Sequence, residues 1–264
     1  LLRQLLTQYK DTDLHLRVIA NNLCLRECPF RLAHGCFVGH SDPEKFSMDY
    51  SLINCAYKKI TQPAAILTAE FIRPEDVHYY RELAEETGNK NFSIKLIDRT
   101  RTTDFLHNVI KSYMEESYDG NLLDIVNWPQ AKTIATRPDQ ANAEGAPVGA
   151  GGPPKGIPNM RWMDMLKPEA MMAYGRTMHL PKLYVDNKKL DGFLEHFIKN
   201  NKCSESLCVN DILENGKTAP NACAHCSTWA KKVISYDENE VAQWTQICSG
   251  ILNSIEDGSI YKEA

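Results

Sequence analysis

The spacing of hydrophobic residues changes several times along the first half of the chain, and each change marks a predicted element. Short apolar runs rich in strand-forming residues predict β-strands, whereas apolar residues three and four positions apart predict amphipathic helices. The predicted strands cover residues 14–20, 65–72 and 92–97. The predicted helices cover about residues 1–10, 74–87 and 103–113. Because strands and helices alternate, the pattern favours a parallel α/β arrangement.

Local signals set the ends of these elements. Pro74 opens the second helix at a first-turn position, and the two acids that follow it stabilise the positive end of a helix. Gly88 ends that helix. Thr102 or Thr103 can begin the next helix, because a threonine side chain accepts a hydrogen bond from a backbone N–H of the first turn.

The second half of the chain has a different composition. Residues 129–160 are dense in Ala, Gly and Pro and nearly free of large apolar side chains, so they cannot bury enough surface to offset their ordering entropy. We expect an irregular linker, or an arm that contacts a protein partner. An amphipathic segment at 190–200 and a final helix at 241–255 follow. The predicted organisation is a partial α/β domain over 1–128, this linker, and a cysteine-rich metal-binding region over 161–264.

Composition narrows the class of protein. The chain has 264 residues with 43% hydrophobic and 24% charged side chains, which is typical of a globular protein with a buried core. The net charge of −4 provides no global attraction to nucleic acid. No apolar run approaches the roughly 20 residues that span a bilayer, and from the first residues of the sequence we expect no signal segment. The nine cysteines are clustered, so we expect a cytoplasmic protein with reduced thiols.

Four cysteines near the C-terminus form the pattern C-x4-C-x14-C-x2-C within polar flanking sequence. They are Cys203, Cys208, Cys223 and Cys226. Four thiolates in so short a span suit a zinc ion or a [4Fe–4S] cluster. A redox dithiol is an alternative, but it leaves Cys203 and Cys208 without a role, and unrelated surface and core thiols are another. Cys248 falls within the final helix pattern, and we expect it to be structural.

A second group of four cysteines lies near the start of the chain. Its members are Cys24, Cys28, Cys36 and Cys55. The group follows the first predicted strand directly, and ligands collect at the carboxyl ends of parallel strands. His34 and His40 are further candidate ligands, since imidazole binds some clusters. The spacing differs from the C-x3-C-x2-C of radical-SAM enzymes. The alternative is that these cysteines pack as small hydrophobic residues.

Two arginines that each follow a predicted strand are candidate substrate ligands. Arg73 and Arg99 can hold a carboxylate or phosphate through paired N–H donors. Asp98 with Arg99 fits a surface ion pair equally well. The sequence has no glycine-rich phosphate loop, no Gly-x-Ser-x-Gly and no His-Glu-x-x-His.

The phrases NNLCLRECPFRLAHGC, EFIRPEDVHYY and FSIKLIDRTRTTDFLHNVI resemble the C-terminal half of the collagenase-like peptidases, the U-thirty-two family. The resemblance covers about residues 12–127. It implies an α/β fold of partial TIM-barrel-like parallel strand–helix units, followed by the irregular linker and the small cysteine-rich region. It also implies a [4Fe–4S] cluster, which in several family members takes part in oxygen-independent hydroxylation of a ubiquinone precursor or of RNA bases. The ligands that it implies are Cys24, Cys28, Cys36 and Cys55.

Three functional hypotheses follow from these patterns. The first is an iron–sulfur oxidoreductase or hydroxylase with one or two [4Fe–4S] clusters, or with zinc at the C-terminal group, acting on a small molecule or an RNA base. The second is a non-catalytic iron–sulfur or zinc subunit that conducts electrons or serves as a scaffold in a larger complex. A peptidase is third, because the sequence provides no recognisable nucleophile–base set or open zinc site.

Overall fold

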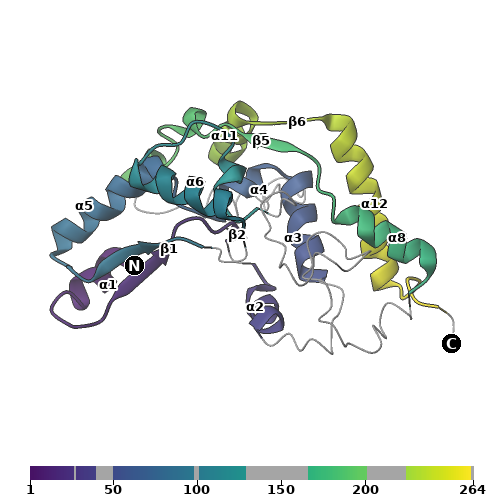
Figure 1. Ribbon diagram of the computed structural model, residues 1–264, viewed down its shortest axis with the longest axis horizontal. Helices are drawn as coiled ribbons and strands as arrows, with labels where there is room; N and C mark the ends of the chain where they lie inside the picture. Colours follow the sequence, from purple (N-terminus) through teal and green to yellow (C-terminus); the bar gives the residue numbers. More distant parts are fainter. Residues whose placement is uncertain (27, 40–49, 98–100, 129–165, 201–223, 263–264) are drawn as a thin grey trace, which may run out of the picture.

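The computed structural model describes residues 1–26, 28–39, 50–97, 101–128, 166–200 and 224–262. Its element order alternates helices and short strands in the N-terminal half and is mainly helical in the C-terminal half (Figure 1). The predicted linker at 129–160 lies outside the described residues.

A short parallel pair of strands organises the N-terminal half. β1 (Leu16–Ile19) pairs with β4 (Phe92–Lys95), with Leu16 opposite Phe92 and Ile19 opposite Lys95. The helices α1 (Leu2–Gln8) and α5 (Val77–Thr87) pack against each other beside this pair (Figure 1). The predicted parallel α/β arrangement is therefore confirmed for these two strands.

The predicted ends of α5 and the predicted start of the next helix are confirmed. The 3-10 turn η2 (Pro74–Asp76) leads into α5, which ends at Gly88 in the left-handed conformation, with φ of 71°. Thr102 caps α6 (Thr103–Met114), because its Oγ1 accepts a hydrogen bond from the N–H of Phe105 at 3.3 Å. The 3-10 turn η3 (Leu122–Asp124) follows α6.

The predicted strand at 65–72 is mostly wrong. Residues Ala64–Leu67 form the helix α4, and only Ala69–Glu70 are extended, as β3. Pro63 starts a helical turn that the alanines and Leu67 continue, because these side chains lose little freedom in a helix. β3 pairs antiparallel with β2 (Cys24–Leu25).

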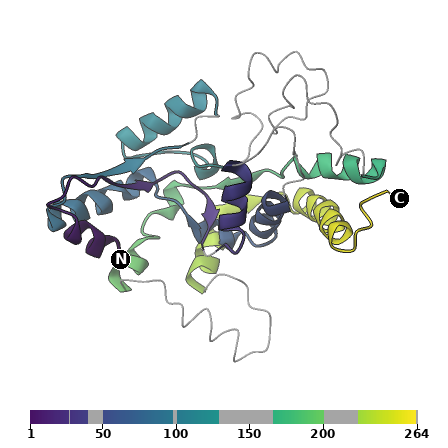
Figure 2. The same ribbon diagram turned by 90° about the horizontal axis from the view of Figure 1, so that it is seen from below.

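The remaining elements are two helices of the N-terminal half and the helices and strands that follow residue 165. They are α2 (Arg31–Gly39), α3 (Tyr50–Thr61), α8 (Pro168–Thr177), η5 (Lys188–Leu190), α9 (Glu195–Asn200), α11 (Ala224–Val233) and α12 (Glu238–Glu256). The strands β5 (Leu183–Val185) and β6 (Ile234–Tyr236) pair antiparallel. Figure 2 shows α8 and α12 side by side at the end of the molecule away from the N-terminus.

One hydrophobic core joins both halves. It includes Ile53 and Ile60 of α3, and Trp244 and Cys248 of α12, all nearly inaccessible to solvent. The indole N–H of Trp244 also donates to the carbonyl of Thr177 at 3.1 Å, which ties α12 to α8. Cys248 is fully buried, as expected for a structural thiol, and burial raises its pKa to about 11.

The structure is a mixture of helices and short strands that includes a parallel pair, in keeping with an α/β class. Within the described residues the sheets are three two-stranded ones, so the barrel-like arrangement stays a prediction. In the same part of the chain, no helix combines the length and hydrophobicity needed to cross a bilayer.

Candidate functional site

The carboxyl end of β1 meets the ends of two other segments. Asn21, which is fully buried, accepts a hydrogen bond from the N–H of Ile97 at 2.7 Å and returns one from its Nδ2 to the Ile97 carbonyl. The Asn21 carbonyl accepts from the N–H of Asn127 at 2.8 Å. Asn21 thereby fixes the start of the cysteine segment against the ends of β4 and of the segment after η3.

Cys24 and Cys28 flank a cation. Cys24 is exposed on β2 opposite Glu70, and the carbonyl of Cys28 accepts from the N–H of Arg31 at 3.1 Å. The Arg31 guanidinium forms an ion pair with Glu70. Its hydrogen bond to Glu70 raises the pKa of Arg31, and the charges of Glu70, Cys24 and Cys28 raise it further against an opposing effect of burial. The Arg31 guanidinium therefore interacts electrostatically with Glu70 first and with both cysteines to a smaller extent.

A buried lysine ties the helix that carries Cys55 to the cysteine segment. Cys55 and Lys59 lie one turn apart on α3, so they share one side of the helix. Lys59 is only 5% exposed, and its Nζ donates to the carbonyl of Leu23 at 2.5 Å and lies 5.9 Å from the centre of the Trp128 ring. Among the described residues, no carboxylate forms an ion pair with Lys59. A buried ammonium without an anion is unfavourable, so this site is prepared for negative charge.

The described side chains do not by themselves form a complete metal site. Within them, no three His, Cys, Asp or Glu side chains lie close enough together to hold a metal ion. The backbone of Cys36 belongs to α2, but its side chain lies outside the described part, as does His40. Cys24, Cys28 and Cys55 all belong to the described residues, so the structure does not bring these three thiols together, and the cluster that they were predicted to bind stays a prediction.

Arg73, predicted to bind substrate, is an internal residue. Its side chain is 1% exposed, and its Nε and Nη2 donate to the two oxygens of Asp76 at 2.7 Å each. Its Nη1 donates to the carbonyl of Asn187 at 3.0 Å. This geometry gives Arg73 a structural role and presents none of these donors to a ligand. The sequence did not indicate this structural role, because one of the partners of Arg73, Asn187, is remote in sequence.

Glu75 reinforces the same connection. Its carboxylate accepts from the backbone N–H of Tyr118 at 2.8 Å and from Nδ2 of Asn187 at 2.9 Å, and Lys188 lies 3.3 Å away. Burial alone would raise the pKa of Glu75, but these hydrogen bonds and the charge of Arg73 lower it overall. The Ile-Arg-Pro-Glu-Asp phrase thus ties the N-terminal half to the segment around η5.

The C-terminal cysteine group is described only at Cys226. The sequence predicted a polar loop there, but Cys226 lies inside α11 and is 2% exposed within the core. Beside it, the His225 ring stacks on that of His196, with 4.2 Å between centroids. Burial lowers the pKa of His225, its contact with the Phe193 carbonyl opposes this, and His196 adds to the lowering.

Four other predicted site residues lie outside the described residues. They are Arg99, Cys203, Cys208 and Cys223. Sequence reasoning missed three residues that shape the site, namely Asn21, Arg31 and Lys59. Arg31 carried a usable signal, because it stands three positions after Cys28 at the start of a helix. Lys59 carried a weaker one, as a charged residue one turn after Cys55 on an otherwise apolar helix face.

A comparison with characterised and named proteins finds a relative described as an uncharacterized protease of Methanocaldococcus jannaschii. It is 30% identical over 123 residues, which is 46% of this chain and 35% of the relative. The chain therefore spans about a third of that relative's length. No protein-family model matches the chain, and no solved structure matches it. The likeness relates the chain to a protein named as a protease. It does not confirm the predicted resemblance to the collagenase-like peptidases or to their iron–sulfur branch, which stays a prediction.

Proposed function

We propose that this chain is an iron–sulfur redox protein related to the collagenase-like peptidases, with a [4Fe–4S] cluster at the carboxyl end of β1. The proposed ligands are Cys24, Cys28, Cys36 and Cys55. The observation that supports this best is the buried Lys59, which has no carboxylate partner among the described residues and contacts the carbonyl next to Cys24. Thiolate ligands give a cluster negative charge, which would stabilise this ammonium.

The roles of the chain's own residues follow from their positions. The four thiolates would bind the cluster. Arg31 and Lys59 would offset its negative charge, and nearby positive charge raises the reduction potential of a cluster. Asn21 fixes the backbone from which the first ligand projects. When bound, the cluster supplies one-electron transfer. The reaction that we propose is oxygen-independent hydroxylation, or related redox chemistry, on a small molecule or an RNA base.

Iron and acid-labile sulfide analysis of anaerobically purified protein tests this proposal. We expect about four irons and four sulfides per chain from the first group, or about eight of each if the C-terminal group also holds a cluster. Cys24→Ser and Cys55→Ser should each lower the iron content, whereas the matched variant Cys248→Ser should not. Zinc alone, or equal iron in all four proteins, would contradict the proposal.

Peptide hydrolysis is the second candidate, and the description of the relative as a protease is what favours it. Incubation of the purified chain with gelatin and with a library of fluorogenic peptides tests it directly. Cleavage that persists in Cys24→Ser and Cys55→Ser, with no iron bound, would favour the peptidase over the redox protein.

A further inference from the structure

Among the described residues, the strand β4 is hydrogen-bonded on one side only. Leu16 N–H donates to the Asn91 carbonyl at 2.8 Å and Ala20 N–H to the Lys95 carbonyl at 3.0 Å, which sets the ladder with β1. In such a ladder, alternate residues direct their backbone groups to the same neighbour. The N–H and carbonyl groups of Phe92 and Ile94 therefore point away from β1. In the part of the chain that the structure describes, no backbone or side-chain group bonds to them.

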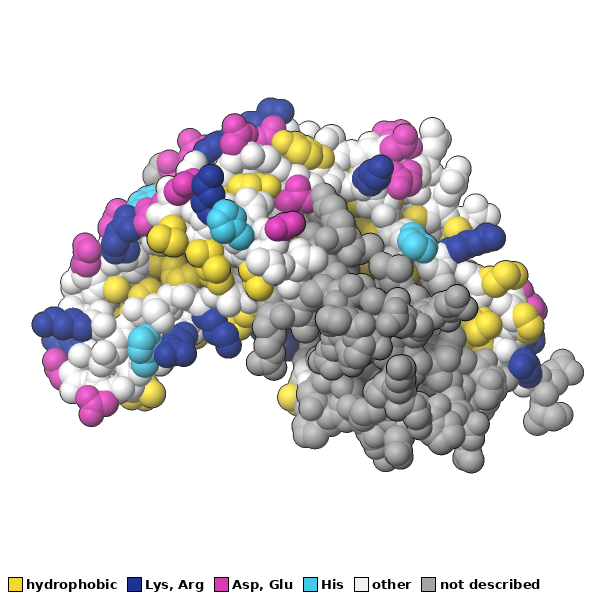
Figure 3. Space-filling model, in the orientation of Figure 1, with side chains coloured by type: hydrophobic (Ala, Val, Ile, Leu, Met, Phe, Trp, Pro, Cys, Tyr) yellow, Lys and Arg dark blue, Asp and Glu magenta, His cyan; other side chains and the backbone are white. Residues whose placement is uncertain are grey.

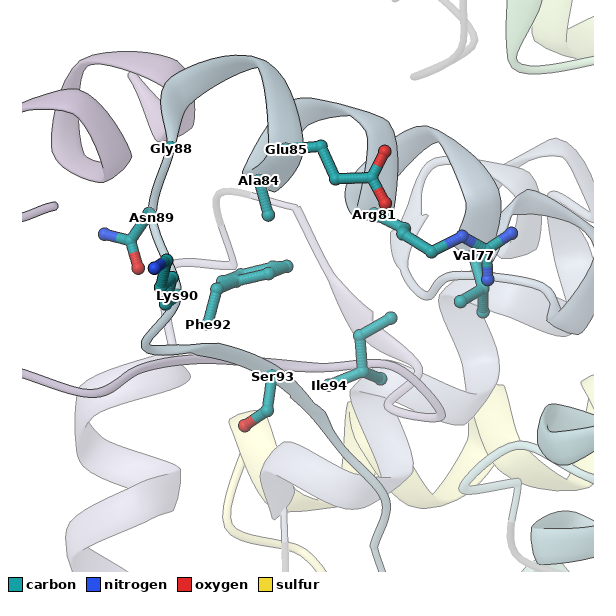
Figure 4. A pocket seen from close by; sticks show the side chains of 10 residues that line it. All are labelled: Val77, Arg81, Ala84, Glu85, Gly88, Asn89, Lys90, Phe92, Ser93 and Ile94. Carbon is teal, nitrogen blue, oxygen red and sulfur yellow. The ribbon is translucent and has the colours of Figure 1, made fainter.

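A groove runs beside this open edge. It has a volume of about 730 Å³ and lies between β4 and one side of α5. Figure 4 shows the side chains of Phe92 and Ile94 pointing toward α5, with Ala84 above them and Ser93 on the opposite side of the strand. Figure 3 shows hydrophobic side chains gathered in the hollow between α5 and the β1–β4 pair. Ala84, Phe92 and Ile94 form the apolar part of the groove, and Arg81, Glu85 and Lys90 also line it.

The other face of the pair carries two cations beside Ile19, which is 43% exposed. Arg17 and Lys95 are exposed there, and neither forms an ion pair with any described residue. The four-residue strands β1 and β4 contain no acidic residue. A strand lying next to β4 would therefore meet apolar surface on the α5 side and positive charge on the opposite side.

We propose that the edge of β4 binds an extended segment of a partner protein in which apolar and acidic residues alternate. The backbone of that segment would bond to Phe92 and Ile94, its apolar side chains would enter the groove, and its acidic side chains would face Lys95. Strand addition of this kind draws affinity from backbone bonds and specificity from alternate side chains. Parallel strands are normally covered on both faces, and a two-stranded sheet this short gains stability from a third strand.

A second copy of the chain fits this edge less well. Antiparallel pairing of two β4 edges brings a lysine-bearing segment from each copy into one short sheet, so the positive charges of Lys90 and Lys95 of the two copies repel at close range. Exposed lysines on an edge strand also hinder self-pairing in natural proteins. An acidic segment relieves this repulsion.

Two labelled seven-residue peptides test the proposal by fluorescence anisotropy with the full chain. One alternates Val and Glu, and the other alternates Val and Lys. We expect saturable binding of the Glu peptide and roughly fivefold or more weaker binding of the Lys peptide, from cross-strand charge effects. Lys95→Glu should reverse this preference, whereas Lys111→Glu, on the exposed side of α6, should leave it unchanged.

Ile94→Pro adds a backbone test, because it removes an N–H that points outward and leaves the β1 ladder intact. It should weaken binding of the Glu peptide roughly tenfold, from a lost hydrogen bond and the clash of the ring. Circular dichroism establishes whether each variant is folded. If Ile94→Pro does not fold, the result for Lys95→Glu tests the proposal. Absence of saturable binding, equal binding of both peptides, or a dimer in sedimentation that the Glu peptide disperses would overturn the proposal.

Discussion

Replacing Arg73 with alanine tests whether the Ile-Arg-Pro-Glu-Asp phrase is an internal clamp. The Arg73 side chain is 1% exposed and that of Asp76 10% exposed, and two hydrogen bonds of 2.7 Å join them. Removal of the guanidinium leaves the Asp76 carboxylate buried without its cation. Breaking a buried pair in this way typically destabilises a protein by about 3–5 kcal/mol. Because typical free energies of unfolding are about 5–15 kcal/mol, the Arg73→Ala variant should lose a large fraction of its free energy of unfolding.

Urea unfolding of the full chain, followed by circular dichroism and tryptophan fluorescence, measures this loss. Arg81→Ala is the matched control, because Arg81 pairs with Glu116 at the surface with its side chain 52% exposed. Its removal should change the midpoint little, since exposed pairs contribute little. The double variant Arg73→Met with Asp76→Leu should recover most of the loss, because it removes both buried charges. Equal midpoints for Arg73→Ala and Arg81→Ala would refute the clamp and restore Arg73 as a candidate substrate ligand.

Four further outcomes are expected. The pKa of Glu75 is lowered in the folded state, so its stabilising effect is present above its unfolded pKa of about 4.3 and is lost as the pH falls through the folded value. Glu75→Gln should therefore lower the urea midpoint at pH 7, with a difference that shrinks toward pH 3; a constant difference would contradict this. Iodoacetamide at pH 8 should modify the exposed Cys24 of metal-free protein well before the buried Cys248, whose pKa is about 11, and mass spectrometry of peptides shows the order. Thr102→Ala should lower the free energy of unfolding by about 1 kcal/mol through loss of the cap, whereas Thr102→Ser should retain it. Lys59→Met should reduce iron retention on dilution into chelator, and unchanged retention would remove the electrostatic support for the cluster.

The elements with local signals were predictable from sequence, because their causes lie within a few residues. α5 begins after Pro74 and ends at Gly88, and α6 begins at its Thr102 cap, as the sequence indicated. The segment 65–72 was not predictable from its apolar run, since a buried strand and a short buried helix share that composition. Its conversion to α4 depends on packing against α11, which lies far along the chain.

The surroundings of the candidate cysteines could not be predicted from the sequence. Clustered cysteines are visible in the sequence, but the buried contact of Lys59 with Leu23 depends on the tertiary placement of α3. The same limit explains Arg73. A polar residue after a strand fits a substrate ligand until its partner Asn187 is known, and that partner is 114 positions away.

Native mass spectrometry of the anaerobically purified chain tests the central claim most directly, because it counts metal and sulfide on each intact molecule. The account predicts a species that carries four irons and four sulfides. It also predicts that this species is absent from Cys55→Ser and persists in Cys248→Ser. A wild-type chain with no iron, or a cluster that survives in Cys55→Ser, would contradict the assignment of the first cysteine group.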